Sequence, residues 1–332
     1  MYGSKKKVNM CILNILREYT DEDHALTQQG IIEKLEQDYG ITCDRRTVKS
    51  YIDDLKDMEW QIEHEKGKEK GYKLMEREFD DADLRLLIDC VLFLKIIPYA
   101  TAERLINKLK DFGSKSFKDK VKHIYNLSAL KHTINRQVMG SLDVIMDAIA
   151  AGKKIQCIYN EVGTDFKLHP KNDGNPYIIN PYQMVENNGN FYLVGNMDQF
   201  DDMIHLRIDK MTDVKLLEER RKDSKNLEEF DANGFYLPQY MAEHISMFSG
   251  KSDWVEIKTN PKMMTTLVDW FGTDFTIEKK DKDYIVIRVK CNLKAVKYWA
   301  IQYGPKVELL KPVDLRKEIK KEIDRMWRKY KD

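Results

Sequence analysis

The sequence has almost no net charge, and it lacks a long hydrophobic run and a signal-type N-terminus. Its 56 lysine and arginine residues nearly balance its 55 acidic residues, which leaves a formal net charge of +1. Nucleic-acid binding therefore requires local basic patches. The longest apolar run, residues 86–94, includes Asp89 and is far shorter than the roughly 20 residues of a membrane span. The basic residues 5–7 are not followed by an apolar block. These absences predict a cytoplasmic protein with no membrane partner.

Signatures of catalysis and of cofactor binding are missing as well. The five cysteines are odd in number and scattered without a Cys-x-x-Cys pair, which favours buried thiols in a reducing compartment over disulfides or a zinc site. There is no Gly-x-x-x-x-Gly-Lys-Ser/Thr loop, no Gly-x-Ser-x-Gly elbow and no His-Glu-x-x-His, and the seven histidines are dispersed. An enzyme is the competing class of protein. Because these motifs are absent, we expect a protein that is not an enzyme, with no catalytic residues, no cofactor and no metal.

The chain of 332 residues is long enough for two or three domains, and its apolar content of 42% is enough to form a core in each. Residues 1–75 have the pattern of a winged helix. Helices are expected over residues 6–19, between Thr27 and Gly40, and over residues 45–58, with Thr27 and Asp44 as N-caps. Two short strands, 60–65 and 71–75, would form the wing.

The third of these helices has the character of a DNA-recognition helix, since it is basic at its N-terminal end and follows a short turn. We expect DNA contacts from this helix and from the wing tip, at Arg45, Arg46, Thr47, Lys49, Ser50, Lys66, Lys68 and Lys70. Residues 1–75 nevertheless hold 13 basic and 15 acidic residues, so the prediction depends on segregation of the charges. The alternative is a helix-turn-helix used for protein contacts.

Residues 76–140 are expected to form a helical linker, with helices over 81–94, 102–112 and 127–138. The lysines of residues 114–122 are typical of a solvated face. Residues 141–220 then change to a β pattern after a helix over 142–151. Strands are expected over 154–159, 166–169, 177–185, 190–195, 203–209 and 214–217, which fits a small, partly closed barrel.

The most informative stretch is residues 188–211, which contains two of these strand patterns. Leu193 and Leu206 belong to the aliphatic sets, so that His205, Arg207 and Asp209 would stand together on the opposite face. Taken alone, a tyrosine and an arginine on such a face are most often ordinary surface residues. A guanidinium group can donate two parallel hydrogen bonds to a phosphate or a carboxylate, and a neighbouring tyrosine can add a further hydrogen bond.

Residues 221–250 are expected to be a connector. Residues 251–332 follow the order β-α-β-β-α-β, which is that of a ferredoxin-like unit, and the last helix begins after Pro312 and runs to about residue 330.

Phe191-Tyr192-Leu193 and the later Arg207-Ile208-Asp209-Lys210-Met211 resemble the two motifs of the WYL domain, with Phe in place of Trp and Lys in place of a second Arg. The resemblance implies a small Sm-like β-barrel that senses a nucleotide or a short nucleic acid in a bacterial transcription regulator. It places ligand-facing residues at Tyr192, Arg207 and Lys210. His205 and Asp209 are added from strand alternation.

Two further segments carry the resemblance. Arg45-Arg46-Thr47-Val48 with Asp53-x-Leu55 resembles the recognition helix of winged-helix regulators that contain WYL domains, and residues 251–332 resemble the C-terminal extension that helps such proteins to dimerise. Members of the family often lie beside phage-defence or DNA-damage genes.

The sequence thus predicts an α+β multidomain protein: winged helix-turn-helix, helical linker, Sm-like barrel and ferredoxin-like unit. As a function it predicts a homodimeric, ligand-responsive repressor of a double-stranded DNA operator. The alternative is an accessory protein that binds single-stranded nucleic acid and modulates a partner enzyme. Binding to a palindromic duplex favours the first, and preference for single strands favours the second.

Overall fold

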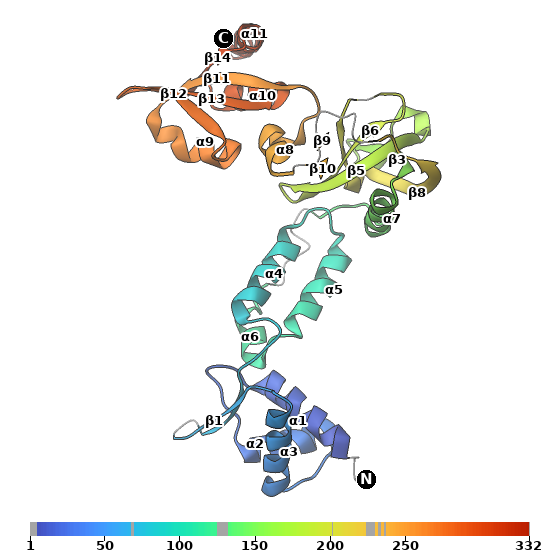
Figure 1. Cartoon of the computed structure of the whole chain (residues 1–332), viewed down its shortest axis with the longest axis vertical. Coiled ribbons are helices and arrows are strands. Elements are labelled where there is room, and N and C mark those ends of the chain that lie inside the picture. Colours follow the sequence, from blue (N-terminus) through green and yellow to red (C-terminus); the bar gives the residue numbers. More distant parts are fainter. Residues whose placement is uncertain are drawn as a thin grey trace. The chain divides into compact units, whose positions relative to one another are not determined.

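The computed structural model describes residues 5–67, 70–124, 132–200, 202–223, 230–231, 234–235 and 237–331. The chain divides into two compact units, Met1–Thr133 and Ile134–Asp332, which run from blue to cyan and from green to red in Figure 1. The first unit holds helices and one β-hairpin, and the second holds two larger sheets with helices. The chain is therefore an α+β protein, as the sequence predicts.

The first unit begins with a winged helix, which confirms the predicted fold of this segment. Its elements are α1 (Lys5–Tyr19), α2 (Gln28–Tyr39), α3 (Arg45–Asp57) and the antiparallel strands β1 (Ile62–Glu65) and β2 (Gly71–Leu74). The Thr27 hydroxyl accepts a hydrogen bond from the amide of Gly30 at the start of α2, and Gly40 ends that helix with a φ of 65°. Both features follow from the sequence, because a hydroxyl satisfies a free helix amide and glycine adopts positive φ without a Cβ clash.

Apolar side chains of all three helices and both strands meet in one core, which includes Ile12, Leu16, Ile31, Ile52 and Leu74. The hairpin is joined to this core through the backbone: Leu26 and Tyr72 exchange hydrogen bonds of 3.0 and 2.9 Å. Gly71 permits this approach, since a Cβ there would lie 2.6 Å from the carbonyl of Leu26. The wing is thus fixed at its base.

The helical linker follows, with α4 (Asp81–Phe93), α5 (Tyr99–Lys110) and α6 (Lys115–Lys120). Its own small core contains Leu84, Ile88, Ile106 and Phe117. The lysines after residue 114 are engaged in ion pairs, Lys118 with Glu18 at 3.0 Å, Lys120 with Asp81 at 3.0 Å and Lys122 with Asp119 at 2.5 Å. This agrees with a solvated, charge-paired face.

The expected helix over 127–138 is wrong where the structure describes it. Residues 125–131 lie outside the described residues, and residues 132–137 are not helical. The Asn135 amide nitrogen donates to the carbonyl oxygens of Asp209 and Met211, at 3.0 and 2.7 Å, and its Oδ1 accepts from the Gln137 amide. Such side-chain to backbone bonds compete with helix formation.

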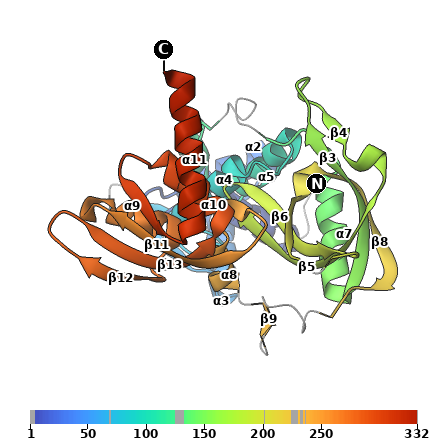
Figure 2. The same cartoon turned by 90° about the horizontal axis from the view of Figure 1, so that it is seen from above.

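The second unit begins with α7 (Val138–Ala151) and a curled, six-stranded sheet. Its strands are β3 (Lys153–Val162), β4 (Leu168–Pro170), β5 (Tyr177–Asn187), β6 (Asn190–Met197), β7 (Ile204–Arg207) and β8 (Met211–Arg220). The order is β4-β3-β5-β6-β7, and β8 pairs with β3. The sheet thus forms a half-barrel, and α7 lies against β3, β5 and β8 (Figure 2). The register shifts after Pro181, at the bulge or edge that a proline in a strand predicts.

One strand is shorter than expected. The second strand of the 188–211 stretch ends at Arg207, and the 3₁₀ turn η3 (Ile208–Lys210) separates it from β8. The Asn160 amide holds this turn by donating to the Lys210 carbonyl at 2.9 Å and to the Thr212 hydroxyl at 3.0 Å. Asp209 therefore lies on a turn and not on a strand face.

A connector with β9 (Phe230–Asp231), β10 (Gly234–Phe235), α8 (Leu237–Glu243) and η5 (Ile245–Met247) leads to the last sheet. That part contains β11 (Ser252–Thr259), η6 (Pro261–Met263), α9 (Met264–Phe271), β12 (Phe275–Lys280), β13 (Ile285–Asn292), α10 (Leu293–Gln302), β14 (Val307–Lys311) and α11 (Val313–Tyr330). The strand order β12-β13-β11-β14, antiparallel throughout, confirms the ferredoxin-like prediction. Among the described residues, no helix is both long and apolar enough to cross a membrane.

Candidate functional site

The N-terminal half of α3 presents the predicted DNA-binding side chains to solvent. Val48, Ile52 and Leu55 bury one side of the helix. The candidate residues lie on the remaining surface: Arg45, Arg46, Lys49 and Ser50 are exposed, and Thr47 is half-buried. The helix starts at a defined residue, because Asp44 Oδ1 accepts a 2.8 Å hydrogen bond from the Thr47 amide. This hydrogen bond keeps the pKa of the Asp44 carboxyl below its usual value.

The start of α2 lies beside this surface. The Arg45 guanidinium donates to the Gln29 side chain at 3.4 Å, and the neighbouring Gln28 amide donates to the Tyr72 hydroxyl on the wing at 3.3 Å. The Tyr72 ring also lies 4.6 Å from that of His64 and 6.0 Å from Lys56 Nζ. Sequence analysis missed Gln28, Gln29 and Tyr72, because only the packed fold brings α2, α3 and the wing together.

The wing itself is basic at its described ends. Lys66 and Lys70 are exposed, and the predicted site residue Lys68 lies outside the described residues. The acidic residues Asp53, Asp54 and Asp57 are exposed further along α3. Charge is therefore segregated along the helix, from basic at its first turn to acidic in its second half.

The second candidate site lies where β6 and β7 pair in the half-barrel. Tyr192 stands opposite Arg207 in the register. The Arg207 amide donates to the Tyr159 hydroxyl of β3 at 3.3 Å, and the Tyr159 ring meets Tyr177 of β5 edge-to-face, with centroids 6.4 Å apart. We call Tyr159, Tyr177, Tyr192, Arg207 and Asp209 the tyrosine–arginine cluster. Tyr159 and Tyr177 were missed, since nothing in strand alternation indicates which strands curl together.

Within this cluster the arginine is already paired. Arg207 Nε donates to Asp209 Oδ1 at 2.9 Å and Nη2 donates to Oδ2 at 2.7 Å. The hydrogen bonds to Asp209 raise the pKa of Arg207, and burial raises the pKa of Tyr159 to about 12 and that of Tyr192 in the same direction. The cluster thus offers a cation whose charge is balanced, and tyrosine hydroxyls that stay protonated at neutral pH.

Lys210 follows Asp209 in η3 and is half-exposed. Its side chain makes no ion pair or hydrogen bond within the described part of the chain. It is the unneutralised cation closest in sequence to the cluster, and it suits an anionic ligand as a point charge.

His205 lies on the Arg207 side of β7, but the connector covers it. Its Nδ1 lies 3.1 Å from the Met247 carbonyl and its Nε2 lies 2.5 Å from the Tyr240 hydroxyl. A carbonyl only accepts, so Nδ1 carries the proton and Nε2 accepts from Tyr240. Burial lowers the pKa of His205 to about 4. Both ring nitrogens are used, and the residue joins the half-barrel to the connector instead of facing a ligand.

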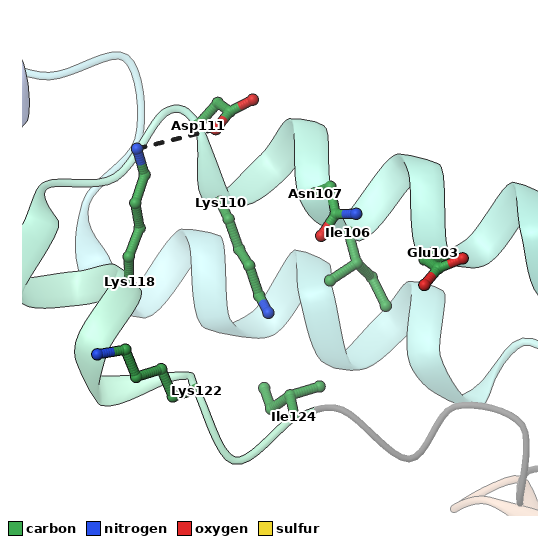
Figure 3. Close-up of a pocket in the computed structure, with 8 residues that line it drawn as sticks. All are labelled: Glu103, Ile106, Asn107, Lys110, Asp111, Lys118, Lys122 and Ile124. Atoms are coloured by element: carbon green, nitrogen blue, oxygen red, sulfur yellow. Dashed lines mark ion pairs between the residues drawn. The ribbon is translucent and has the colours of Figure 1, made fainter.

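A surface cleft of about 490 Å³ lies in the helical linker of the first unit and is shown in Figure 3. Two of its lysines are engaged, Lys118 with Asp111 at 3.8 Å as well as with Glu18, and Lys122 with Asp119. These pairs reduce its attraction for an anion. In the described ranges, no group of three or more His, Cys, Asp or Glu side chains is arranged to hold a metal ion.

Residues 140–216 match the family model of the WYL domain, so this segment of the chain is a WYL domain. This confirms the resemblance seen in residues 191–193 and 207–211. Among solved structures, the chain is similar to proteasome accessory factor B/C (PafBC) of Arthrobacter aurescens, with 14% identity, a TM-score of 0.30, and coverage of 99% of this chain and 49% of that one. It therefore spans about half the length of that protein.

A CRISPR Cas-related protein is similar at 13% identity and a TM-score of 0.36, with coverage of 100% of this chain and 89% of the other. Likenesses as low as these two establish neither a shared arrangement of domains nor a shared activity. No curated protein matches the chain.

Proposed function

We propose that the chain is a ligand-responsive transcription regulator that binds duplex DNA as a homodimer, and that it acts as a repressor whose WYL domain binds a nucleotide or a short nucleic acid. The observation that carries this proposal is the basic, exposed first turn of α3 in a winged helix that shares its chain with a WYL domain. A helix presented in this way enters the major groove with its N-terminal side chains at the base edges.

The geometry of the winged helix supports duplex binding in two ways. The arginine and lysine side chains lie on the first turn and a half of α3, where they reach bases and phosphates together. Gln29 is held beside them by the hydrogen bond from Arg45, and its neighbour Gln28 donates to the hydroxyl of the buried wing residue Tyr72. The acidic residues of the winged helix do not oppose this, because Asp53, Asp54 and Asp57 lie further along the helix.

The tyrosine–arginine cluster supports an anionic ligand for the WYL domain. Arg207 keeps three N–H groups after its two bonds to Asp209, and Lys210 adds a charge that no neighbour in the described residues neutralises. Three tyrosines supply ring faces and hydroxyl groups. Phosphate with an attached base fits both features.

The experiment is selection of duplex DNA from a random pool, followed by anisotropy titrations. Arg46→Ala or Lys49→Ala should weaken binding to the selected site by about 1–3 kcal/mol where the residue reads a base, with relaxed specificity at that position. Lys34→Ala, on the far half of α2, is the matched control and should leave affinity unchanged. Selected sites should be palindromic, with half-sites about 10 base pairs or a multiple apart.

The competing function, an accessory protein for single strands, predicts a different outcome. The pool would then yield no common duplex, single strands would bind more tightly than duplexes, and Arg46→Ala would have no effect. That result would remove the regulator proposal and leave the WYL domain as the nucleic-acid site.

A further inference from the structure

The ferredoxin-like sheet at the C-terminus has one face opposite the core that α9, α10 and α11 cover, and α8 contacts the sheet at β13, where Glu243 pairs with Lys290. In β11 and β13, Val255, Ile257, Ile287 and Val289 are buried in a core to which α9, α10 and α11 contribute. The alternating residues point to the other side of the sheet: Trp254, Glu256 and Lys258 on β11, and Val286, Arg288 and Lys290 on β13. Of these, Val286 is buried. We call this second side the open face. It lies on the two central strands of the four-stranded sheet.

Trp254 is the conspicuous residue of the open face. It is 47% exposed although it lies in a central strand, and the Arg288 guanidinium carbon lies 4.6 Å from the centre of its ring. In the register Trp254 stands opposite Lys290, so Arg288 is its diagonal neighbour. The core does not need this indole, because the buried face already has Trp299 and Phe271.

Some charged side chains of the open face are paired with opposite charges, and others are not. Two carboxylates of this side form ion pairs, Glu256 with Lys311 at 2.8 Å and, on β14, Glu308 with Arg316 at 2.5 Å, whereas Glu278 of β12 hydrogen-bonds Thr276, which lies opposite Arg288. Lys290 is paired with Glu243 at 3.1 Å.

Two cations are left over. Arg288 and Lys258 have no carboxylate partner in the described part of the chain. Lys258 lies instead over the Tyr284 ring, 4.8 Å from its centre. Two unneutralised cations, each beside an aromatic ring, thus flank the middle of the face.

We infer that this open face binds single-stranded nucleic acid, with a base stacked at the Trp254–Arg288 pair and the backbone phosphate near Lys258. Indole rings and guanidinium planes both stack on bases, and stacking is tolerant of sequence because every base has a ring face. A four-stranded sheet whose central strands carry aromatic side chains is the surface that RNA-recognition modules use. The site is separate from the tyrosine–arginine cluster and from α3.

The test uses the full chain and a fluorescein-labelled oligo(dT) of about 15 nucleotides, a length that spans one such surface. Anisotropy at several salt concentrations gives the affinity of the wild type, Trp254→Ala, Trp254→Phe and Arg288→Ala. Tyr298→Ala is the matched control, since Tyr298 is 54% exposed on α10, across the sheet. All are measured in an Arg207→Ala background as well, so that binding at the WYL domain is scored separately.

Trp254→Ala should lower affinity about 5- to 140-fold, the loss of one stacked base, and Trp254→Phe should keep most of it. Arg288→Ala should also reduce the slope of log affinity against log salt by about 0.7, as expected for one phosphate-neutralising charge on a single strand. Tyr298→Ala should match the wild type.

Three results would overturn the inference. The first would be that the wild type does not bind oligo(dT), and the second that Trp254→Ala binds oligo(dT) as tightly as the wild type does. The third would be that Trp254→Ala changes the oligomeric state in light scattering, which would assign the face to a second copy of the chain. None of these touches the regulator proposal, which depends on duplex binding through α3. Conversely, loss of duplex specificity leaves this inference standing.

Discussion

Arg207 shows how one neighbour changes what a binding residue can offer. Strand alternation predicts a guanidinium group that is free to bind an anion through two N–H groups. In the structure, the Nε and Nη2 groups of Arg207 already donate hydrogen bonds to Asp209. A ligand therefore meets an arginine whose position is already fixed, so less side-chain entropy is lost on binding. The same pairing restricts the ligand to the remaining N–H groups. A ligand that needs both edges of the guanidinium would have to displace Asp209.

His205 carries a prediction at the same scale, since its pKa is lowered to about 4 by burial. The neutral ring accepts from Tyr240 and donates to Met247, while His244 lies 5.1 Å away. Between the ordinary histidine pKa of about 6.5 and about 4, the unfolded chain binds more protons than the folded one. The unfolding free energy should therefore fall as pH falls through this window, by up to about 1.4 kcal/mol for each pH unit.

Urea unfolding of the wild type and of His205→Gln, at pH values between about 7 and about 5, measures the pH-dependent contribution of His205 to the unfolding free energy. The stability advantage of the wild type should shrink by up to about 2 kcal/mol over this range, because the variant has no group to titrate at that position. His244, whose pKa burial also lowers, is present in both proteins and cancels. A constant difference across the range would show that His205 does not stay neutral in the folded state.

At the scale of elements, Asp44 at the start of α3 has two effects: it stabilises the helix, and it adds a negative charge near the proposed DNA-binding surface. Its carboxylate caps the helix through the Thr47 amide, and it also places a negative charge beside Arg45 and Arg46. Asp44→Ala should lower the local opening free energy of α3 by about 1 kcal/mol, measured by hydrogen exchange of its amides. It should at the same time strengthen non-specific duplex binding, because less phosphate repulsion remains.

Two matched variants separate these effects. Asp44→Asn keeps an acceptor for the cap and removes the charge, so stability should stay near wild type while DNA affinity rises. Thr27→Ala removes the cap of α2 with no change in charge, so only stability should fall. If Asp44→Asn and Asp44→Ala bind DNA as weakly as the wild type, this end of α3 does not meet phosphate.

The elements that sequence predicted well are those set by local chemistry. The caps at Thr27 and Asp44 and the end of the second helix at Gly40 depend on one residue and its immediate backbone. Periodicity was also sufficient for the strand and helix order of the ferredoxin-like unit, where β11 alternates between buried and more exposed positions.

The failures have a common physical origin in contacts between distant segments. Asn135 and Asn160 use their amides to hold residues 208–212; Asn135 lies among residues 132–137, which are not helical as expected, and the turn held by Asn160 shortens one strand. Alternation placed His205 on the correct face of β7, but the covering residue Tyr240 comes from a connector with no sequence motif. For the candidate site, the pairing of Tyr192 with Arg207 follows from two adjacent strands, whereas Tyr159 joins them only through the curl of the sheet.

On the scale of the whole molecule, the proposed regulator requires the WYL domain in the second unit to alter DNA binding by the first. A ligand shifts operator affinity only by the difference in its affinity for the two states of the protein, commonly about 1–3 kcal/mol in total. Removing the ligand site should therefore abolish the response without abolishing DNA binding.

Arg207→Ala provides this test, with operator affinity measured by anisotropy in the presence and absence of a panel of nucleotides and short oligonucleotides. The variant should bind the operator as the wild type does but lose the response to the effective ligand, and Tyr192→Phe should show a smaller loss if the hydroxyl bonds the ligand. Arg220→Ala, an exposed arginine at the end of β8, is the matched control. Because Asp209 is only 12% exposed and loses its partner in Arg207→Ala, the double variant with Asp209→Asn should be tested beside it; it removes the unpaired buried charge and restores part of the stability. An equally large response in the wild type and in both Arg207 variants would exclude the tyrosine–arginine cluster as the site of regulation.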